Sequence, residues 1–175
     1  MTKYNSKKPF PYVVLKVRKI TGNIFENVDL AREFEFNNDS HKTVFLSRFD
    51  MEKTRQKKKA TDGTDIAIDL QDSKIKHGDV LSEGILKVLV RQTTEQVITA
   101  QIGNLDGPSL VLLGHIIGNI HRPVSIEKGS ISFPIYKETE LDLFRSLFGS
   151  MADKISLAIE EKIFQPHKSM NVHEH

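Results

Sequence analysis

The stretch LDGPSLVLLGHIIGNI, residues 105–120, predicts a helix and decides the expected fold of the second half of the chain. Asp106 suits the N-cap, because its carboxylate can accept a hydrogen bond from a backbone N–H of the first turn. Pro108 suits that first turn, where a missing N–H costs nothing. The apolar run within this helix, residues 110–117, is far shorter than the roughly 18–20 residues needed to span a bilayer. We therefore expect a helix of a globular domain and no membrane association.

Strand and turn patterns surround this helix. We expect strands at 96–102, 124–127, 131–135 and 155–164, a hairpin turn at Lys128-Gly129, and a second helix over 141–148 ending at Gly149. The resulting order is strand, helix, strand, strand, helix, strand. This order is that of the split βαβ, or ferredoxin-like, fold.

The first half of the chain has a different pattern, with short apolar runs separated by turn signals such as Asp62-Gly63. Strands are expected at 12–17, 43–48, 66–70, 80–81 and 85–90. Such spacing is typical of a small twisted β-sandwich or an open barrel. The expected fold class is therefore α+β, with a small β-sandwich or barrel-like domain followed by a ferredoxin-like metal-binding domain.

The charge distribution supports a division into two domains. Residues 1–92 carry 18 Lys and Arg against 13 Asp and Glu, or +5, whereas residues 93–175 carry 7 against 10, or −3. We expect an N-terminal domain at 1–92, a second domain at 93–164, and a flexible tail at 165–175 that has no apolar periodicity. The basic N-terminus is not followed by an apolar signal region, so a cytoplasmic location is expected.

The chain has no cysteine, which excludes disulfides, thiolate nucleophiles and Cys-ligated metal sites. Metal binding would have to use imidazole and carboxylate, a ligand set suited to nickel, zinc or copper. Three of the seven histidines, His167, His173 and His175, lie in the last nine residues. We treat all three as candidate metal ligands, although an ordinary polar terminus would explain them equally well.

His121 is the central candidate, at the end of the predicted helix. On a helix, His115 and His121 would diverge by about 120°, so they do not form a chelating pair. A second His121, from a two-fold related copy of the chain, or the tail histidines would have to complete a site. The alternative is a surface histidine near a helix C-terminus, where a positive charge is favourable.

No catalytic signature is present, since phosphate-binding loops and the G-x-S-x-G motif are missing. We therefore expect no enzymatic activity. One basic cluster occupies residues 53–59, and we expect it to form a solvated loop that protects a sheet edge. It would alternatively serve an RNA- or ribosome-associated binding module, whose affinity would depend steeply on salt.

Three segments carry a family resemblance. The first is Gly118-Asn119-Ile120-His121, followed by Arg122-Pro123; the second combines residues 53–59 with Asp62-Gly63 and Gly78-Asp79-Val80-Leu81; the third is Phe164-Gln165-Pro166 with the terminal His173-Glu174-His175. Together they resemble the urease accessory protein E family, the nickel metallochaperones of urease maturation. The resemblance runs from about Tyr12 to the C-terminus.

This resemblance implies a homodimer that binds Ni²⁺ between two copies of His121, assisted by His173 and His175. Zn²⁺ or Cu²⁺ would also be accepted in vitro. It further implies delivery of nickel to a urease accessory GTPase and to apo-urease, with no nucleic acid involved. The chain departs from the family at Ile120, where an arginine is usual. His167 has no family counterpart and is carried as a further candidate ligand.

Overall fold

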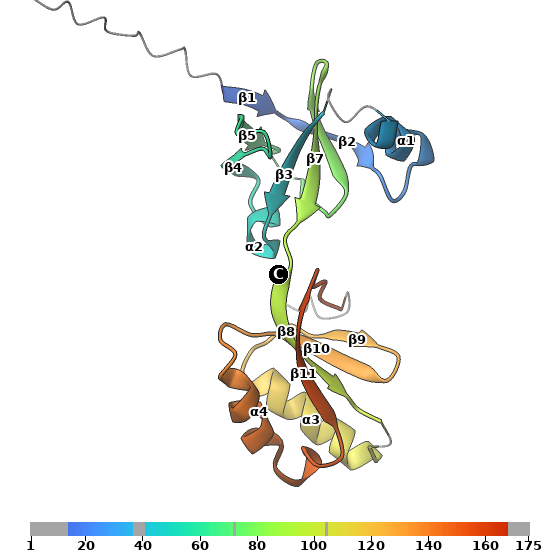
Figure 1. Ribbon diagram of the computed structural model, residues 1–175, viewed down its shortest axis with the longest axis vertical. Helices are drawn as coiled ribbons and strands as arrows, with labels where there is room; N and C mark the ends of the chain where they lie inside the picture. The colour runs from blue at the N-terminus through green and yellow to red at the C-terminus, as the bar shows by residue number, and fades with distance from the viewer. Residues whose placement is uncertain (1–13, 37–40, 72, 104, 168–175) are drawn as a thin grey trace, which may run out of the picture. The chain divides into compact units, whose positions relative to one another are not determined.

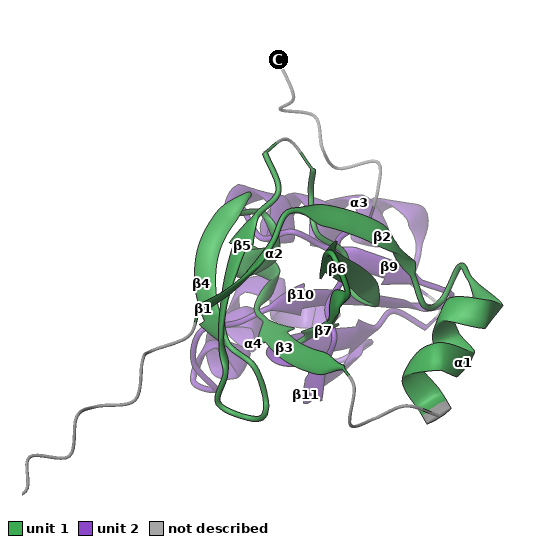
Figure 2. Ribbon diagram, turned by 90° about the horizontal axis from the view of Figure 1, so that it is seen from above, with its two compact units in different colours: residues 1–93 green, residues 94–175 purple. Residues whose placement is uncertain are grey.

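The computed structural model describes residues 14–36, 41–71, 73–103 and 105–167. These residues form a mixed α+β protein with three mostly antiparallel sheets and four α-helices (Figure 1). The chain divides into two compact units, residues 1–93 and 94–175, coloured separately in Figure 2. Within the described part, none of the helices is long and apolar enough to cross a membrane.

Unit 1 contains two sheets. The first has the order β1-β5-β4 and comprises β1 (Val14–Val17), β4 (Arg55–Lys59) and β5 (Asp65–Asp69). The second has the order β2-β6-β7-β3 and comprises β2 (Lys19–Asn23), β3 (Lys42–Leu46), β6 (Asp79–Glu83) and β7 (Leu86–Gln92). Two of the pairings, β1 with β5 and β3 with β7, are parallel.

Alternation in the sequence explains why these strands pack. Ile66 and Ile68 of β5 lie on one face and are both buried, as the period-two pattern predicts. They join Val17, Val44 and Leu81 in a core cluster that contains residues from both sheets. The turn before β5 contains Gly63, whose φ of 84° lies in the left-handed region, as expected for an Asp-Gly turn.

The structure corrects two predictions in unit 1. The basic segment 53–59 is not a loop, because residues 55–59 form edge strand β4 in antiparallel register with β5. The strand expected at 43–48 ends at Leu46, because Ser47 begins the short helix α2 (Arg48–Met51) with a capping box. In this box Ser47 and Asp50 exchange side-chain to backbone hydrogen bonds. Residues 12 and 13, expected to start the first strand, lie outside the described residues.

Helix α1 (Val28–Phe36) was not predicted. Its Leu30 and Phe34, one helical turn apart, are buried against Val80 and Leu89 of strands β6 and β7. This small second core holds α1 on unit 1. An apolar pair at i, i+4 is therefore the feature that sets the helix in place.

Unit 2 contains one antiparallel sheet and two helices. Its elements are β8 (Glu95–Gln101), α3 (Gly107–Asn119), β9 (Ser125–Glu127), β10 (Ser130–Pro134), α4 (Glu140–Phe148), a 3-10 turn (Gly149–Met151) and β11 (Ser156–Lys162). The sheet order is β11-β8-β10-β9. Leu113 of α3, Phe144 of α4 and Ile98 of β8 belong to a single buried cluster, so both helices cover the same face of the sheet.

Local signals set the boundaries of these helices as predicted. The Asp106 carboxylate accepts a 2.8 Å hydrogen bond from the Ser109 N–H at the start of α3. That bond lowers the pKa of Asp106. Helix α4 ends at Gly149, with φ of 53°, and Gly129 turns the β9–β10 hairpin with φ of 81°.

Candidate metal centre

His121 follows the C-cap residue Ile120 of α3, in the connection between α3 and β9. Its N–H donates a 2.9 Å hydrogen bond to the Gly118 carbonyl, and its φ of 52° is left-handed. For a residue with a side chain this conformation costs roughly 1–2 kcal/mol, and glycine is the usual choice there. The side chain is exposed. The imidazole of His121 is therefore presented from a strained turn, and contacts of the neighbouring residues must stabilise that turn.

The residues on both sides of His121 are anchored. Ile120 is partly buried and packs against the unit 2 core. Arg122 donates a 2.7 Å hydrogen bond from Nη2 to Oε2 of Glu140, at the start of α4, and its guanidinium lies 4.0 Å from the centre of the Tyr136 ring. At Ile120, where the resemblance noted above predicts an arginine, an apolar side chain packs against the core.

His115 is not brought together with His121. It lies on α3 itself, exposed, and its Nε2 lies 3.0 Å from Nδ2 of Asn119, one turn further along the helix. His121 has already left the helix, so the helical spacing of these two residues does not apply to their side chains. The structure offers no reason to treat His115 as a ligand.

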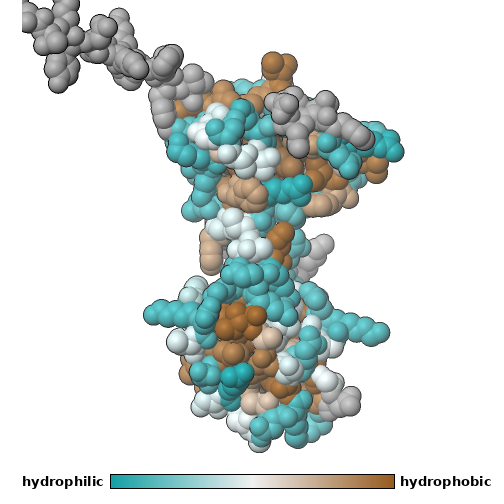
Figure 3. Space-filling view, viewed as in Figure 1, coloured by the Kyte–Doolittle hydropathy of each residue, from teal (hydrophilic) through white to brown (hydrophobic). Residues whose placement is uncertain are grey.

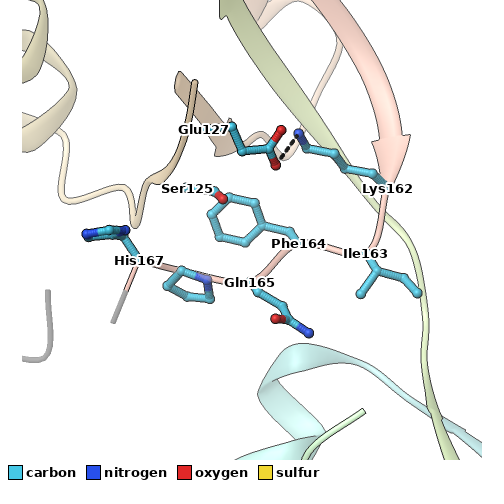
Figure 4. Close-up of a pocket in the computed structure, with 8 residues that line it drawn as sticks. Ser125, Glu127, Lys162, Ile163, Phe164, Gln165 and His167 are labelled. Carbon is cyan, nitrogen blue, oxygen red and sulfur yellow. Dashed lines mark ion pairs between the residues drawn. The ribbon is translucent and has the colours of Figure 1, made fainter. Parts of the chain in front are cut away.

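His167 is brought close to the connection that carries His121. Its N–H donates a 2.8 Å hydrogen bond to the Val124 carbonyl. Figure 4 shows the His167 ring beside the segment that leads from α3 to β9. His167 is exposed and is the last residue that the structure describes. The predicted ligands His173 and His175 follow it and lie outside the described residues.

A hollow of about 430 Å³ lies next to this contact. It is lined by Ser125, Glu127, Lys162, Ile163, Phe164, Gln165, Pro166 and His167 (Figure 4). The ammonium group of Lys162 lies 3.9 Å from Glu127 and donates a 2.7 Å hydrogen bond to Ser132. A lysine paired with the carboxylate would repel a divalent cation. The hollow is therefore not a plausible metal site by itself.

Among residues 14–36, 41–71, 73–103 and 105–167, no group of three or more His, Cys, Asp or Glu side chains is placed to hold one metal ion. His121 and His167 are the two predicted ligands that the structure describes, and both are exposed. A complete site would need donors from a second copy of the chain or from residues 168–175.

The histidines of unit 1 have structural roles. His41 stacks on Phe34 with 4.1 Å between ring centres and is largely buried. Nδ1 of His77 accepts a 3.0 Å hydrogen bond from the Gln92 N–H, which requires a neutral ring. Burial, together with the nearby charge of Arg91, lowers the pKa of His77 below 6.5.

Sequence reasoning did not find the contact between Arg122 and Glu140, because the two residues lie on different elements and no motif links them. The position of Arg122 directly after His121 was the only available signal.

In the comparisons with known proteins, no family model matches this chain and no curated protein matches it.

Proposed function

We propose that this chain is a nickel metallochaperone of the urease accessory protein E type. In this proposal a homodimer binds Ni²⁺ between two copies of His121, with help from His167, His173 and His175. It then delivers the ion to a urease accessory GTPase and apo-urease in the cytoplasm. The protein carries its metal as cargo and has no catalytic activity of its own.

The observation that carries the proposal is the setting of His121. This exposed imidazole stands at the end of α3, a helix with only two buried residues, Leu113 and Ile117. Val111 is 75% exposed and Leu112 is 49% exposed on the same helix. Apolar surface is also visible on unit 2 in Figure 3. Exposed apolar surface of this kind favours association with another surface. A two-fold contact involving α3 would bring two His121 side chains into one site.

The architecture of unit 2 supports the same assignment. Its strand–helix–strand–strand–helix–strand order, with β8 and β10 at the centre of the sheet, agrees with a ferredoxin-like domain. For unit 1, two small sheets that share one core agree with a β-sandwich or barrel-like domain that docks partners. We propose this pair of domains as the division of labour between partner binding and metal binding.

A site made from a few exposed histidines also suits a carrier. Nickel bound by one imidazole from each subunit, and by donors after residue 167, could exchange with a partner protein. A closed cage would retain the ion. Imidazoles coordinate only when neutral, so we expect affinity to fall as histidines become protonated.

Isothermal titration calorimetry with Ni²⁺ tests the proposal on wild type, His121→Ala and His115→Ala. We expect His121→Ala to lose the high-affinity site of about one ion per dimer, since each subunit contributes one imidazole. The control, His115→Ala, removes an exposed histidine of the same unit and should bind as wild type does. Unchanged affinity and stoichiometry in His121→Ala would refute the proposal.

A further inference from the structure

We propose that Arg122 and Glu140 act as a positioning pair for His121, holding its backbone in the conformation that presents the imidazole. The inference rests on the proposed nickel function. It adds two residues that make no contact with the metal and act only through His121.

The ion pair between Arg122 and Glu140 is shielded from solvent on the side of both residues. The Arg122 side chain is only 14% exposed and that of Glu140 only 16%, so the 2.7 Å ion pair between them is well shielded. The guanidinium also lies 4.0 Å from the centre of the Tyr136 ring. Its Nη1 is buried without a hydrogen-bond partner among the described residues. Glu140 and Tyr136 are therefore the described groups that hold this cation.

The same carboxylate is fixed to the backbone before α4. Oε1 of Glu140 accepts hydrogen bonds from the N–H groups of Tyr136, at 2.8 Å, and Lys137, at 3.1 Å. The single carboxylate of Glu140 thus binds both the Arg122 side chain and the backbone of the segment that leads into α4. Arg122 is consequently held against the segment that leads into α4.

This anchor limits the freedom of His121. Pro123 restricts the backbone of Arg122 to extended conformations, and Ile120 is packed against the core on the other side. His121 stands between these two fixed residues with its left-handed φ of 52°. Release of Arg122 would allow the turn to relax to a less strained conformation and turn the imidazole away.

Electrostatics predicts the opposite effect of the same change. Arg122 is a cation next to the residue that would bind Ni²⁺, so removal of its charge should by itself strengthen binding. A positioning role predicts weaker binding. The sign of the change in affinity therefore separates the two explanations.

The experiment is nickel calorimetry on full-length wild type, Arg122→Gln, Glu140→Gln and Arg145→Gln, at a pH where free imidazole is neutral. We expect Arg122→Gln and Glu140→Gln each to weaken binding about tenfold or more, the usual effect of groups that orient a metal ligand. Arg145→Gln is the control, because it removes an exposed arginine of α4 that pairs with Asp142. It should leave the affinity unchanged.

Arg122→Lys and NMR of the histidine rings separate positioning from a general loss of structure. Lysine keeps the charge and the partner Glu140, and should restore most of the affinity. In metal-free Arg122→Gln, the ring resonances of His121 should shift while those of His115 do not. Equal or stronger nickel binding by folded Arg122→Gln would overturn the inference. Nickel binding that survives in His121→Ala would instead overturn the proposed function.

Discussion

The His167 N–H donates a 2.8 Å hydrogen bond to the Val124 carbonyl, which ties the end of the described chain to the segment just after His121. The described chain therefore ends at the connection that carries the proposed metal ligand His121. This contact brings His167 to the connection that carries His121, although the two histidines lie far apart in the sequence.

His167→Ala tests whether the imidazole itself contributes to metal binding. The backbone hydrogen bond to Val124 survives this change, so the path of the chain is retained. We expect nickel affinity to fall about tenfold, equivalent to about 1.4 kcal/mol, if the ring is a ligand. The measurement is a nickel titration of wild type and His167→Ala, compared with a chain that ends after His167 and so lacks His173 and His175. Equal affinity in wild type and His167→Ala would remove His167 from the site.

Val111→Lys tests the proposed contact between subunits. A charge at this exposed apolar position of α3 should not disturb the fold, but it should weaken a contact that buries Val111. We expect a shift from dimer to monomer in sedimentation equilibrium, together with loss of the shared nickel site. Ile85→Lys is the matched control, since Ile85 is fully exposed at the β6–β7 turn of unit 1. A dimer that persists in Val111→Lys would exclude Val111 from the interface.

RNA binding by the basic strand β4 distinguishes the proposed nickel carrier from the alternative RNA-binding module. Its cations face carboxylates: Arg55 lies 2.8 Å from Asp69, and Lys59 lies 3.2 Å from Asp65. Cations that are paired with carboxylates attract phosphate groups less strongly, so we expect weak RNA binding with little salt dependence. The measurement is RNA fluorescence anisotropy at about 50 and 200 mM salt.

The variant for this test replaces Lys57, Lys58 and Lys59 by glutamine. Nickel affinity should not change, because the substitutions lie in unit 1. Loss of the Lys58 contact to Asp50, 2.6 Å in length, should lower the stability of unit 1 by about 1 kcal/mol. Tight RNA binding by wild type that falls steeply with salt and is lost in the variant would favour the RNA module.

The hydrogen bond from Gln92 to His77 predicts that unit 1 is less stable in acid. The pKa of His77 is lower in the folded chain than its unfolded value of 6.5, chiefly through burial. The unfolded chain therefore binds more protons just below pH 6.5, and stability falls as pH falls through that window. Above the unfolded pKa the contribution of His77 is complete.

Urea unfolding monitored by circular dichroism across this pH range measures the effect. His77→Gln should show a smaller loss of stability between neutral and mildly acidic pH than wild type. His115→Gln, a change at an exposed histidine, should keep the wild-type slope. An identical pH dependence in wild type and His77→Gln would contradict the assignment of this sensitivity to His77.

Unit 2 was largely predictable because its signals are local. Asp106 and Pro108 indicate the start of α3, and Gly149 indicates the end of α4. These signals act through hydrogen bonds and φ values that involve only neighbouring residues. In unit 1 the predictions failed at β4. Lysine and arginine rarely favour strands, and these residues are extended because β5 pairs with them.

For the candidate site, the sequence by itself determined that His121 follows a helix and that cysteine chemistry is excluded. Only the tertiary structure decided that Arg122 meets Glu140 and that His167 lies against Val124. These contacts join residues from different elements. They depend on how α3, α4 and the sheet pack, and this packing follows from burial of the shared core, which no short stretch of sequence specifies.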